Sequence, residues 1–254
     1  MSNTGNATYR TGQFVWRELM TTDTAKAKGF YGELFGWAFK DVDMGPMTYT
    51  LVHAGEKQIA GMMKSPPGGP PHPFWSSYVS VTDVDATVKA WEASGGKLLM
   101  PAQDIPNVGR FAYVMDPQGG VLAVFRGATG DGEASMPPKL GEFCWESLMT
   151  SDVAKAKDFY MKVIGWTLGE GPDPSMVVMK SAGGPVADVM GCPPGVPTMW
   201  GTYVHVEKVE ASRDRAAKLG GNVLMPLLEI PKIGRIATVA DPTGAVISLF
   251  QSQM

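Results

Sequence analysis

The chain has 254 residues, of which 44% are hydrophobic and 19% charged, and its formal net charge is −3. This composition is typical of a globular protein that buries a sizeable core. The slight acidity gives no reason to expect nucleic acid or an anionic membrane as a partner. The sequence has no bilayer-length apolar stretch, no signal-peptide pattern and only two cysteines, so we expect a cytoplasmic protein without a disulfide framework.

The first predicted elements belong to a unit that the chain repeats. The stretches "VWRELMTTDTAKAKGFY" and "CWESLMTSDVAKAKDFY" place Trp16 and Trp145 129 residues apart. The offset between the copies falls to 127 residues at the proline-rich loops and to 125 residues beyond them. This ordered duplication predicts two tandem domains at 1–127 and 140–254, joined by a Gly-, Pro- and Ser-rich linker at 128–139.

Each copy contains a second, weaker repeat. A shift of 60 residues lays Asp23 over Asp83 and Gly36 over Gly96. The aspartates are expected to cap helices, because a side-chain oxygen can accept from free backbone N–H groups, and the glycines to end them. A strand-like run precedes each helix and three follow it. The sequence therefore predicts an α+β protein of four βαβββ modules.

These modules, the opening "ELMTTDTAKAKGFYGELFGW" and the closing "DPQGGVLAVF" resemble the vicinal oxygen chelate superfamily. That group includes glyoxalase I, bleomycin-resistance proteins and extradiol dioxygenases. The resemblance runs from about residue 13 to 125 and again from about 142 to 250, and it is nearest to two-domain glyoxalase-like members. It implies that modules pair into two domains, each a curved mixed sheet around a cleft with helices outside.

Metal-dependent members of this group hold a divalent ion in the cleft through His, Glu or Gln side chains. The resemblance places the corresponding positions of the two copies at Trp16 and Trp145, Ser76 and Gly201, Ala123 and Ser248, and Gly61 and Asp188. Zinc or iron needs three or more N, O or S donors, which these side chains do not supply. We therefore expect no metal and no other cofactor, which argues against glyoxalase I or dioxygenase chemistry in its usual form.

Side chains along a strand alternate between its two faces, so residues two apart from a metal position share the cleft with it. The resulting ligand-binding candidates, with an arginine from each copy, are Trp16, Glu18, Tyr78, Arg110, Phe125, Trp145, Tyr203, His205, Arg235 and Phe250. A flat, mostly apolar cleft with few polar groups suits a small aromatic or heterocyclic molecule. The alternative is that the two cleft tryptophans fill the cleft as core residues.

The polar candidates each have a functional and a structural interpretation. Glu18 could act as a general base or pair with a cationic ligand, or it could form an ion pair with an arginine. Arg110 and Arg235 could clamp a carboxylate or phosphate, or hold structural ion pairs. His205 could transfer a proton or be a satisfied core histidine. The candidate catalytic residues are Glu18, Tyr78 and His205.

Three functions fit this pattern. The first is metal-independent binding of a small aromatic or heterocyclic molecule in one or both clefts, as in bleomycin-resistance-type sequestration or carriage. The alternative is a glyoxalase-like lyase or a dioxygenase- or hydroxylase-type enzyme with a metal or acid/base site at other positions. The third is an interaction protein with filled clefts. The tandem copy suggests a monomer with an internal pseudo-dimer, and modules could pair within a copy or across the linker.

Overall fold

The computed structural model describes residues 8–45, 47–66, 68, 72–132, 136–171, 176–193 and 195–253. The first copy contains β1 (Phe14–Thr21), α1 (Thr24–Phe35), β2 (Ala38–Asp43), β3 (Thr48–Ala54), β4 (Lys57–Lys64), β5 (Phe74–Ser80), α2 (Val84–Ala93), β6 (Lys97–Ile105), β7 (Gly109–Met115) and β8 (Val121–Gly127). The second copy contains β9 (Phe143–Thr150), α3 (Val153–Ile164), β10 (Thr167–Gly169), β11 (Val177–Ser181), β12 (Gly184–Gly191), β13 (Met199–His205), α4 (Val209–Lys218), β14 (Asn222–Ile230), β15 (Gly234–Ala240) and β16 (Val246–Ser252).

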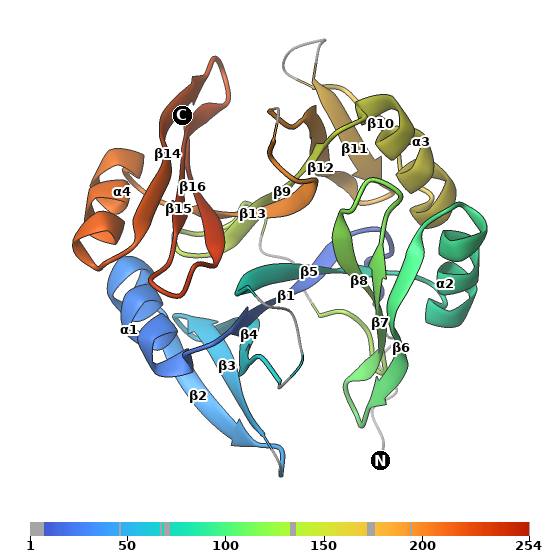
Figure 1. The fold of residues 1–254 in the computed structure, drawn as a ribbon, viewed down its shortest axis with the longest axis horizontal. Helices are drawn as coiled ribbons and strands as arrows, with labels where there is room; N and C mark the ends of the chain where they lie inside the picture. The colour runs from blue at the N-terminus through green and yellow to red at the C-terminus, as the bar shows by residue number, and fades with distance from the viewer. Residues whose placement is uncertain are drawn as a thin grey trace. The chain divides into compact units, whose positions relative to one another are not determined.

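The strands form two mixed sheets of eight strands with the same order. One runs β2-β3-β4-β1-β5-β8-β7-β6 and the other β10-β11-β12-β9-β13-β16-β15-β14 (Figure 1). In each module the first strand pairs in parallel with the last, as β1 does with β4 and β9 does with β12. The predicted α+β fold of four βαβββ modules is therefore confirmed.

The helix ends follow the predicted chemistry with one shift. Asp23 and Asp83 cap α1 and α2, since their side chains accept hydrogen bonds from the backbone N–H groups of Lys26 and Ala86. Gly36 ends α1 in the left-handed conformation, with φ of 71°. Helix α2 ends earlier than predicted, because it stops before the left-handed Gly95, whose φ is 90°.

Modules from different copies pack into compact units. The β5–β8 module packs with the β9–β12 module, and their helices α2 and α3 are in contact. We call this the α2–α3 unit. The β1–β4 module packs with the β13–β16 module in the same way, giving the α1–α4 unit. The two modules of each copy thus share one sheet, as predicted, and each also packs against a module of the other copy, while the boundaries predicted from the repeat, 1–127 and 140–254, stay a prediction for the domains.

Each unit has its own hydrophobic core between strands and helices. In the α2–α3 unit, Trp91 of α2 meets Phe159 of α3 edge to face, with ring centroids 4.9 Å apart. Val79 of β5 and Val81, directly after it, are buried in this core. Because successive side chains alternate, Tyr78 and Ser80 lie on the other face of β5.

A buried tyrosine locks the two modules of the α2–α3 unit together. The Tyr160 hydroxyl of α3 donates to Asp116 Oδ2 at 2.8 Å and accepts from Trp200 Nε1 at 2.9 Å. Asp116 Oδ1 accepts from the N–H groups of the turn after β7, at residues 118–120. Burial, followed by the charge of Asp116, raises the pKa of the Tyr160 phenol well above its usual value. The lock therefore joins α3 of one copy to a turn of the other.

The α1–α4 unit repeats this arrangement with the equivalent residues. Trp75 Nε1 donates to the Tyr31 hydroxyl at 2.8 Å, and Asp241 Oδ1 accepts from the turn at residues 243–245. Burial, followed by the charge of Asp241, raises the pKa of Tyr31 well above its usual value. Trp75 and Trp200 thus anchor the segments that connect the two modules of each copy.

Candidate functional site

The tryptophans fall into two groups by burial. Of the seven in the chain, five are core residues with relative exposures of 0–7%, namely Trp37, Trp75, Trp91, Trp166 and Trp200. Trp16 and Trp145, the pair predicted to line the clefts, are only half-buried. They therefore differ from the tryptophans that serve as packing.

Trp16 belongs to a hydrogen-bonded chain on β1 and β3. Its indole Nε1 donates to the Tyr49 hydroxyl at 3.2 Å, and that hydroxyl donates to Glu18 Oε2 at 2.8 Å. Glu18 is only 6% exposed. The indole is thereby held by its N–H, and a buried carboxylate sits one hydrogen bond beyond it.

Gly61 of β4 makes room for this chain. It lies next to Glu18 in the register of the parallel β1–β4 pair. A Cβ atom added at Gly61 would lie 1.8 Å from the Tyr49 hydroxyl oxygen, so any other residue would displace Tyr49. An isolated glycine within a strand often marks such a close approach.

In the second copy the equivalent carboxylate lies on the neighbouring strand. Ser147, at the Glu18 position, donates to Asp188, which stands where the first copy has Gly61. Both residues are buried. Met176, directly before β11, takes the place of Tyr49. At this pair of positions each copy therefore has a buried carboxylate that accepts from a hydroxyl, but different residues supply the two groups.

Two tyrosines cover the helix-free face of the β5–β8 module in the first copy. Tyr78 of β5 and Tyr113 of β7 are both register neighbours of Ala123 on β8. Their hydroxyl oxygens are 3.0 Å apart, and the two tyrosines are 4% and 6% exposed. Phe125 and Phe111 form the next row along the same face. This face is a packed aromatic layer.

The β13–β16 module of the second copy keeps the same row positions with smaller residues. Tyr203 and Thr238 flank Ser248, and the Thr238 and Ser248 hydroxyl oxygens are 2.9 Å apart. Tyr203 and Thr238 are half-buried, unlike their buried counterparts in the first copy. His205, Phe250 and Ile236 form the next row. Ser248 and Ile236 are buried, so this face differs from that of the first copy mainly in the exposure of Tyr203 and Thr238.

The predicted linker contacts the same strand position in both copies. Ser80 Oγ, at the end of β5, donates to Asp131 Oδ2 at 2.6 Å. His205, the equivalent residue of β13, has its Nδ1 atom 3.1 Å from the Pro138 carbonyl oxygen. Since a carbonyl only accepts, this contact needs the tautomer with a proton on Nδ1. The segment therefore covers the ends of two central strands.

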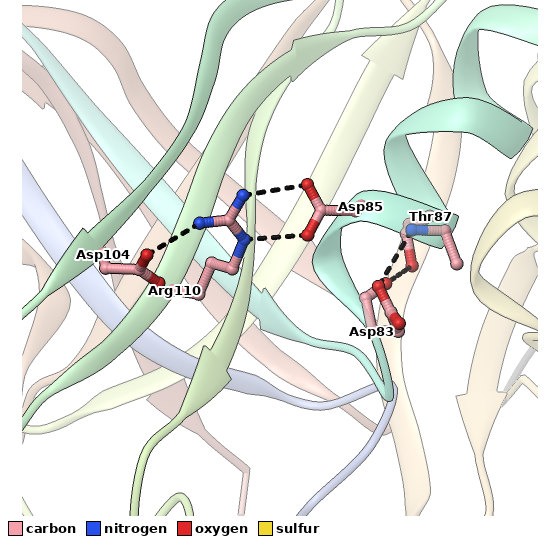
Figure 2. Close-up of polar contacts among 6 residues, drawn as sticks. Asp83, Asp85, Thr87, Asp104 and Arg110 are labelled. Atoms are coloured by element: carbon pink, nitrogen blue, oxygen red, sulfur yellow. Dashed lines mark hydrogen bonds and ion pairs between the residues drawn. The ribbon is translucent and has the colours of Figure 1, made fainter.

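The two arginine candidates hold ion pairs on the helix side of the sheets. Figure 2 shows Arg110 between two carboxylates, with Nε 2.8 Å from Asp85 and Nη1 2.9 Å from Asp104. The guanidinium holds the pKa of Asp85 below its ordinary value. Arg235 pairs in the same way with Glu210 of α4. These are the structural ion pairs that the sequence analysis considered for both arginines.

The sequence also matches known proteins over its whole length. The Glyoxalase/Bleomycin resistance protein/Dioxygenase superfamily matches residues 13–125, and the bleomycin resistance protein-like N-terminal family matches residues 143–181. "Putative glyoxylase CFP32" of Mycobacterium tuberculosis is 34% identical over 251 residues, which cover 96% of both chains. The chain belongs to the glyoxalase/bleomycin resistance/dioxygenase superfamily. The "Anthracycline biosynthesis protein DauV" of Streptomyces sp. is a further superfamily relative, 30% identical over 94% of this chain and 93% of that protein.

Solved structures of the superfamily share the fold. The 2,3-dioxygenase LapB from Pseudomonas sp. KL28 superposes with a TM-score of 0.64 at 12% identity, covering 96% of this chain and 94% of LapB. The Mn(II)-bound glyoxalase from Novosphingobium aromaticivorans gives 0.63 at 13% identity, covering 95% of this chain and 82% of that one. At these identities the likeness concerns the fold alone.

The residues at the superfamily's metal positions do not fit a divalent ion. An indole, a methyl group and a backbone-only residue at Trp16, Ala123 and Gly61 offer no donor, and Ser76 is a neutral hydroxyl. Among the residues that the structure describes, no group of three or more His, Cys, Asp or Glu side chains is placed to hold a metal. Glu18 and Asp188 each supply a single carboxylate. The donor chemistry therefore disagrees with a metal site of the superfamily's type.

Sequence reasoning missed four residues of these clusters. Tyr49 was assigned no role, although the glycine at position 61, inside the apolar run "IAGMM", signals a close approach to its strand. Tyr113 and Thr238 lie on β7 and β15, strands for which only the arginines were considered. Asp131 lies in the predicted linker, where nothing in the local pattern indicated a contact with Ser80.

Proposed function

We propose that this protein binds a small aromatic or heterocyclic molecule without a metal, beside Trp16, Trp145 or both. The observation that carries the proposal is the split among the tryptophans. Five are buried in the cores, whereas the two at the superfamily's first metal position remain half-buried. An indole that is partly accessible and oriented by its neighbours offers a flat apolar surface for stacking.

The surroundings of the two tryptophans support a binding role. Trp16 is oriented by its bond to Tyr49, with Glu18 next in the chain. In the second copy, Tyr203, His205 and Phe250 are also half-buried, so aromatic and polar groups remain accessible. The relatives from Streptomyces are named anthracycline biosynthesis proteins, which supports a small molecule as the ligand.

Tryptophan fluorescence tests the proposal. Metal content is first measured by elemental mass spectrometry on protein purified without added metal or chelator. A library of aromatic and heterocyclic fragments is then titrated, and saturable quenching is expected from metal-poor protein. Trp16→Phe and Trp145→Phe assign the quenching to one copy, and Trp91→Phe serves as the control in the core. Stoichiometric metal, or no saturable quenching by any fragment, would refute the proposal.

A second candidate function is proton transfer, and the Tyr49–Glu18 hydrogen bond favours it. A phenol that donates to a buried carboxylate is a plausible acid/base pair, because each group modulates the proton affinity of the other. Tyr49 here takes the place that the sequence analysis gave to Tyr78. Chemical change of a bound fragment, detected by mass spectrometry and abolished by Glu18→Gln, distinguishes this function from binding alone.

The expected assembly and location remain proposals. Each compact unit already combines modules from both copies, which is consistent with a monomer that contains its own pseudo-dimer. None of the helices in the described part of the chain is long and apolar enough to cross a membrane. Sedimentation of the purified protein tests the first proposal, and fractionation of cells tests the predicted cytoplasmic location.

A further inference from the structure

The helix-free face of the β1–β4 module is apolar and partly accessible. Glu18 and Met20 of β1 lie in register with Gly61 and Met63 of β4, and β3 continues the same rows. Leu19, between Glu18 and Met20, points to the opposite face and is buried in the core of the α1–α4 unit. Five side chains of the helix-free face are half-buried and keep part of their surface accessible: Trp16, Met20, Tyr49, Leu51 and Met63. We call these five residues the Trp16 surface.

This face contains one buried carboxylate. Glu18 is the only acidic residue of β1, β3 and β4, strands that the structure describes in full. It is 6% exposed and accepts from the Tyr49 hydroxyl at 2.8 Å. The basic residues of the face, His53 and Lys40, lie two and three strands from β1, about 10 and 14 Å away at the usual strand spacing. On this face the charge nearest to Trp16 is therefore the carboxylate of Glu18.

The indole of Trp16 is coupled to this carboxylate. Its Nε1–H donates to the Tyr49 hydroxyl at 3.2 Å, and the same hydroxyl donates to Glu18. Hydrogen bonds in such a chain polarise one another, so an indole that donates toward an anion becomes richer in electrons on its ring face. Tryptophan is also the side chain that attracts a cation most strongly over its ring. Trp16 therefore presents a ring face that suits a positively charged group.

The equivalent positions of the second copy lack the phenol that makes this coupling. Met176 stands where the first copy has Tyr49, and a thioether sulfur cannot donate a hydrogen bond to a carboxylate. The carboxylate of Asp188 accepts instead from Ser147, which stands where the first copy has Glu18. Of the two copies, the first is thus the one in which a phenol bridges indole and carboxylate.

We propose that the Trp16 surface of the first copy binds an aromatic cation, a nitrogen heterocycle with a fixed or protonated positive charge. This inference rests on the proposed function, to which it adds the copy and the charge of the ligand. The positive ring stacks on the accessible part of the Trp16 indole, and the methionine and leucine side chains of the surface contact its apolar atoms. Glu18 is a positioning residue, because it acts on the ligand through Tyr49 and Trp16.

Isothermal titration calorimetry with two isosteric probes tests the inference. The probes are 1-methylquinolinium and 1-methylnaphthalene, which have the same shape and differ by a permanent positive charge. The wild-type protein is expected to bind the cation about tenfold more tightly, because the attraction to the indole face and the charge of Glu18 favour it alone. Quenching of tryptophan fluorescence by the cation should be smaller in Trp16→Phe, since that variant lacks the indole that the cation contacts.

Removal of the Glu18 charge should remove most of this preference. Glu18→Gln keeps an oxygen that can accept from Tyr49, so the indole stays oriented while the negative charge is lost. The cation is expected to bind about fivefold less tightly and the neutral probe to change less than about twofold, a split that loss of structure alone would not produce. Glu33→Gln, at an exposed position of α1, removes a charge elsewhere in the same module and is the matched control, with less than about twofold change for both probes.

Tyr49→Phe keeps the test decisive if Glu18→Gln does not fold. It removes the hydroxyl that joins the indole to the carboxylate, so the preference for the cation should fall about threefold. Circular dichroism and thermal unfolding check that each variant folds.

Three results would each overturn the inference. They are equal affinity of the wild type for both probes, an unchanged preference in Glu18→Gln (or in Tyr49→Phe where it replaces that variant), and loss of the preference in Asp188→Asn, the carboxylate variant of the second copy. Saturable quenching by charged and neutral fragments alike would still uphold the proposed function. Only the absence of saturable binding across the whole library would remove both.

Discussion

On the helix-free face of the first copy, Tyr78 and Tyr113 join their hydroxyls above Ala123, whereas on the same face of the second copy Thr238 pairs with Ser248 and leaves Tyr203 half-buried. On the helix-covered face the copies are alike, with valine, alanine and leucine or isoleucine at equivalent positions. Packing against a helix constrains both copies equally. The other face has no such constraint, so the duplicated modules could diverge there.

Because both copies share the buried aspartate that holds the turn, we expect its substitution to lower the free energy of unfolding equally in both. Asp116→Ala and Asp241→Ala should each destabilise the protein by about 3 kcal/mol, because each leaves buried backbone N–H groups without an acceptor. For a chain of this size that corresponds to a fall in melting temperature of roughly 6–12 °C. Thermal unfolding followed by circular dichroism measures it. Asp116→Asn retains an acceptor oxygen and should cost less, and a large loss in only one copy would contradict the equivalence.

A bulkier residue at the centre of the row should destabilise the protein more in the first copy than in the second. Ala123→Leu inserts a side chain beneath the tyrosine pair and is expected to cost about 2–3 kcal/mol through overpacking. Ser248 is also buried, but its neighbours Tyr203 and Thr238 are only half-buried and can move aside, so Ser248→Leu should cost less, about 1–2 kcal/mol. Urea unfolding of the two variants gives both values. Equal losses would show that the second row is as tightly packed as the first.

Removal of a single hydroxyl should give a smaller difference in the same direction. Tyr113→Phe leaves the buried Tyr78 hydroxyl without this partner and should lower the free energy of unfolding by about 1–2 kcal/mol. Thr238→Val removes the half-buried partner of the buried Ser248 hydroxyl, so we expect a smaller loss, about 0.5–1 kcal/mol. Chemical denaturation resolves this difference. A greater loss in the Thr238 variant would contradict the expectation that the less buried hydroxyl contributes less to stability.

The smallest effect is expected at the ion pairs of the helix-covered side. Arg110→Ala should lower the melting temperature by about 2 °C or less, because exposed ion pairs contribute little and are screened by salt. Arg110 holds the pKa of Asp85 below its ordinary value of 3.8, so the stabilisation exists above that pH and is lost as the pH falls below it. Melting curves of wild type and variant between pH 7 and strongly acidic pH should converge. Arg235→Ala is the matched variant of the second copy.

Much of the fold could be predicted from the sequence because its determinants are local. The Asp caps, the helix-ending Gly36 and the duplicated aromatic positions each depend on neighbouring residues and on periodicity. The packing of modules from different copies could not be predicted in this way. Helix α2 packs on α3 and α1 on α4 through contacts between distant parts of the chain. The repeat is compatible with pairing either within a copy or across the linker.

The candidate site was only partly predictable for the same reason. Alternation along β5 and β13 correctly separated Tyr78 and Tyr203 from the core-facing valines. It could not show that Tyr78 meets Tyr113, because that contact depends on the residue two strands away. Tyr49 was missed likewise, since its contact with Glu18 joins residues 31 apart.

The pairing of modules across the linker also has a consequence for synthesis. The β1–β4 module leaves the ribosome first, but its partner, β13–β16, is translated last. Leu19, Phe30 and Tyr31 are buried in the α1–α4 unit, so their core can close only after almost the entire chain has been synthesised. The middle pair of modules is complete earlier, so we expect its core to close first. The apolar side chains of the first module are then the ones that stay unburied longest during synthesis.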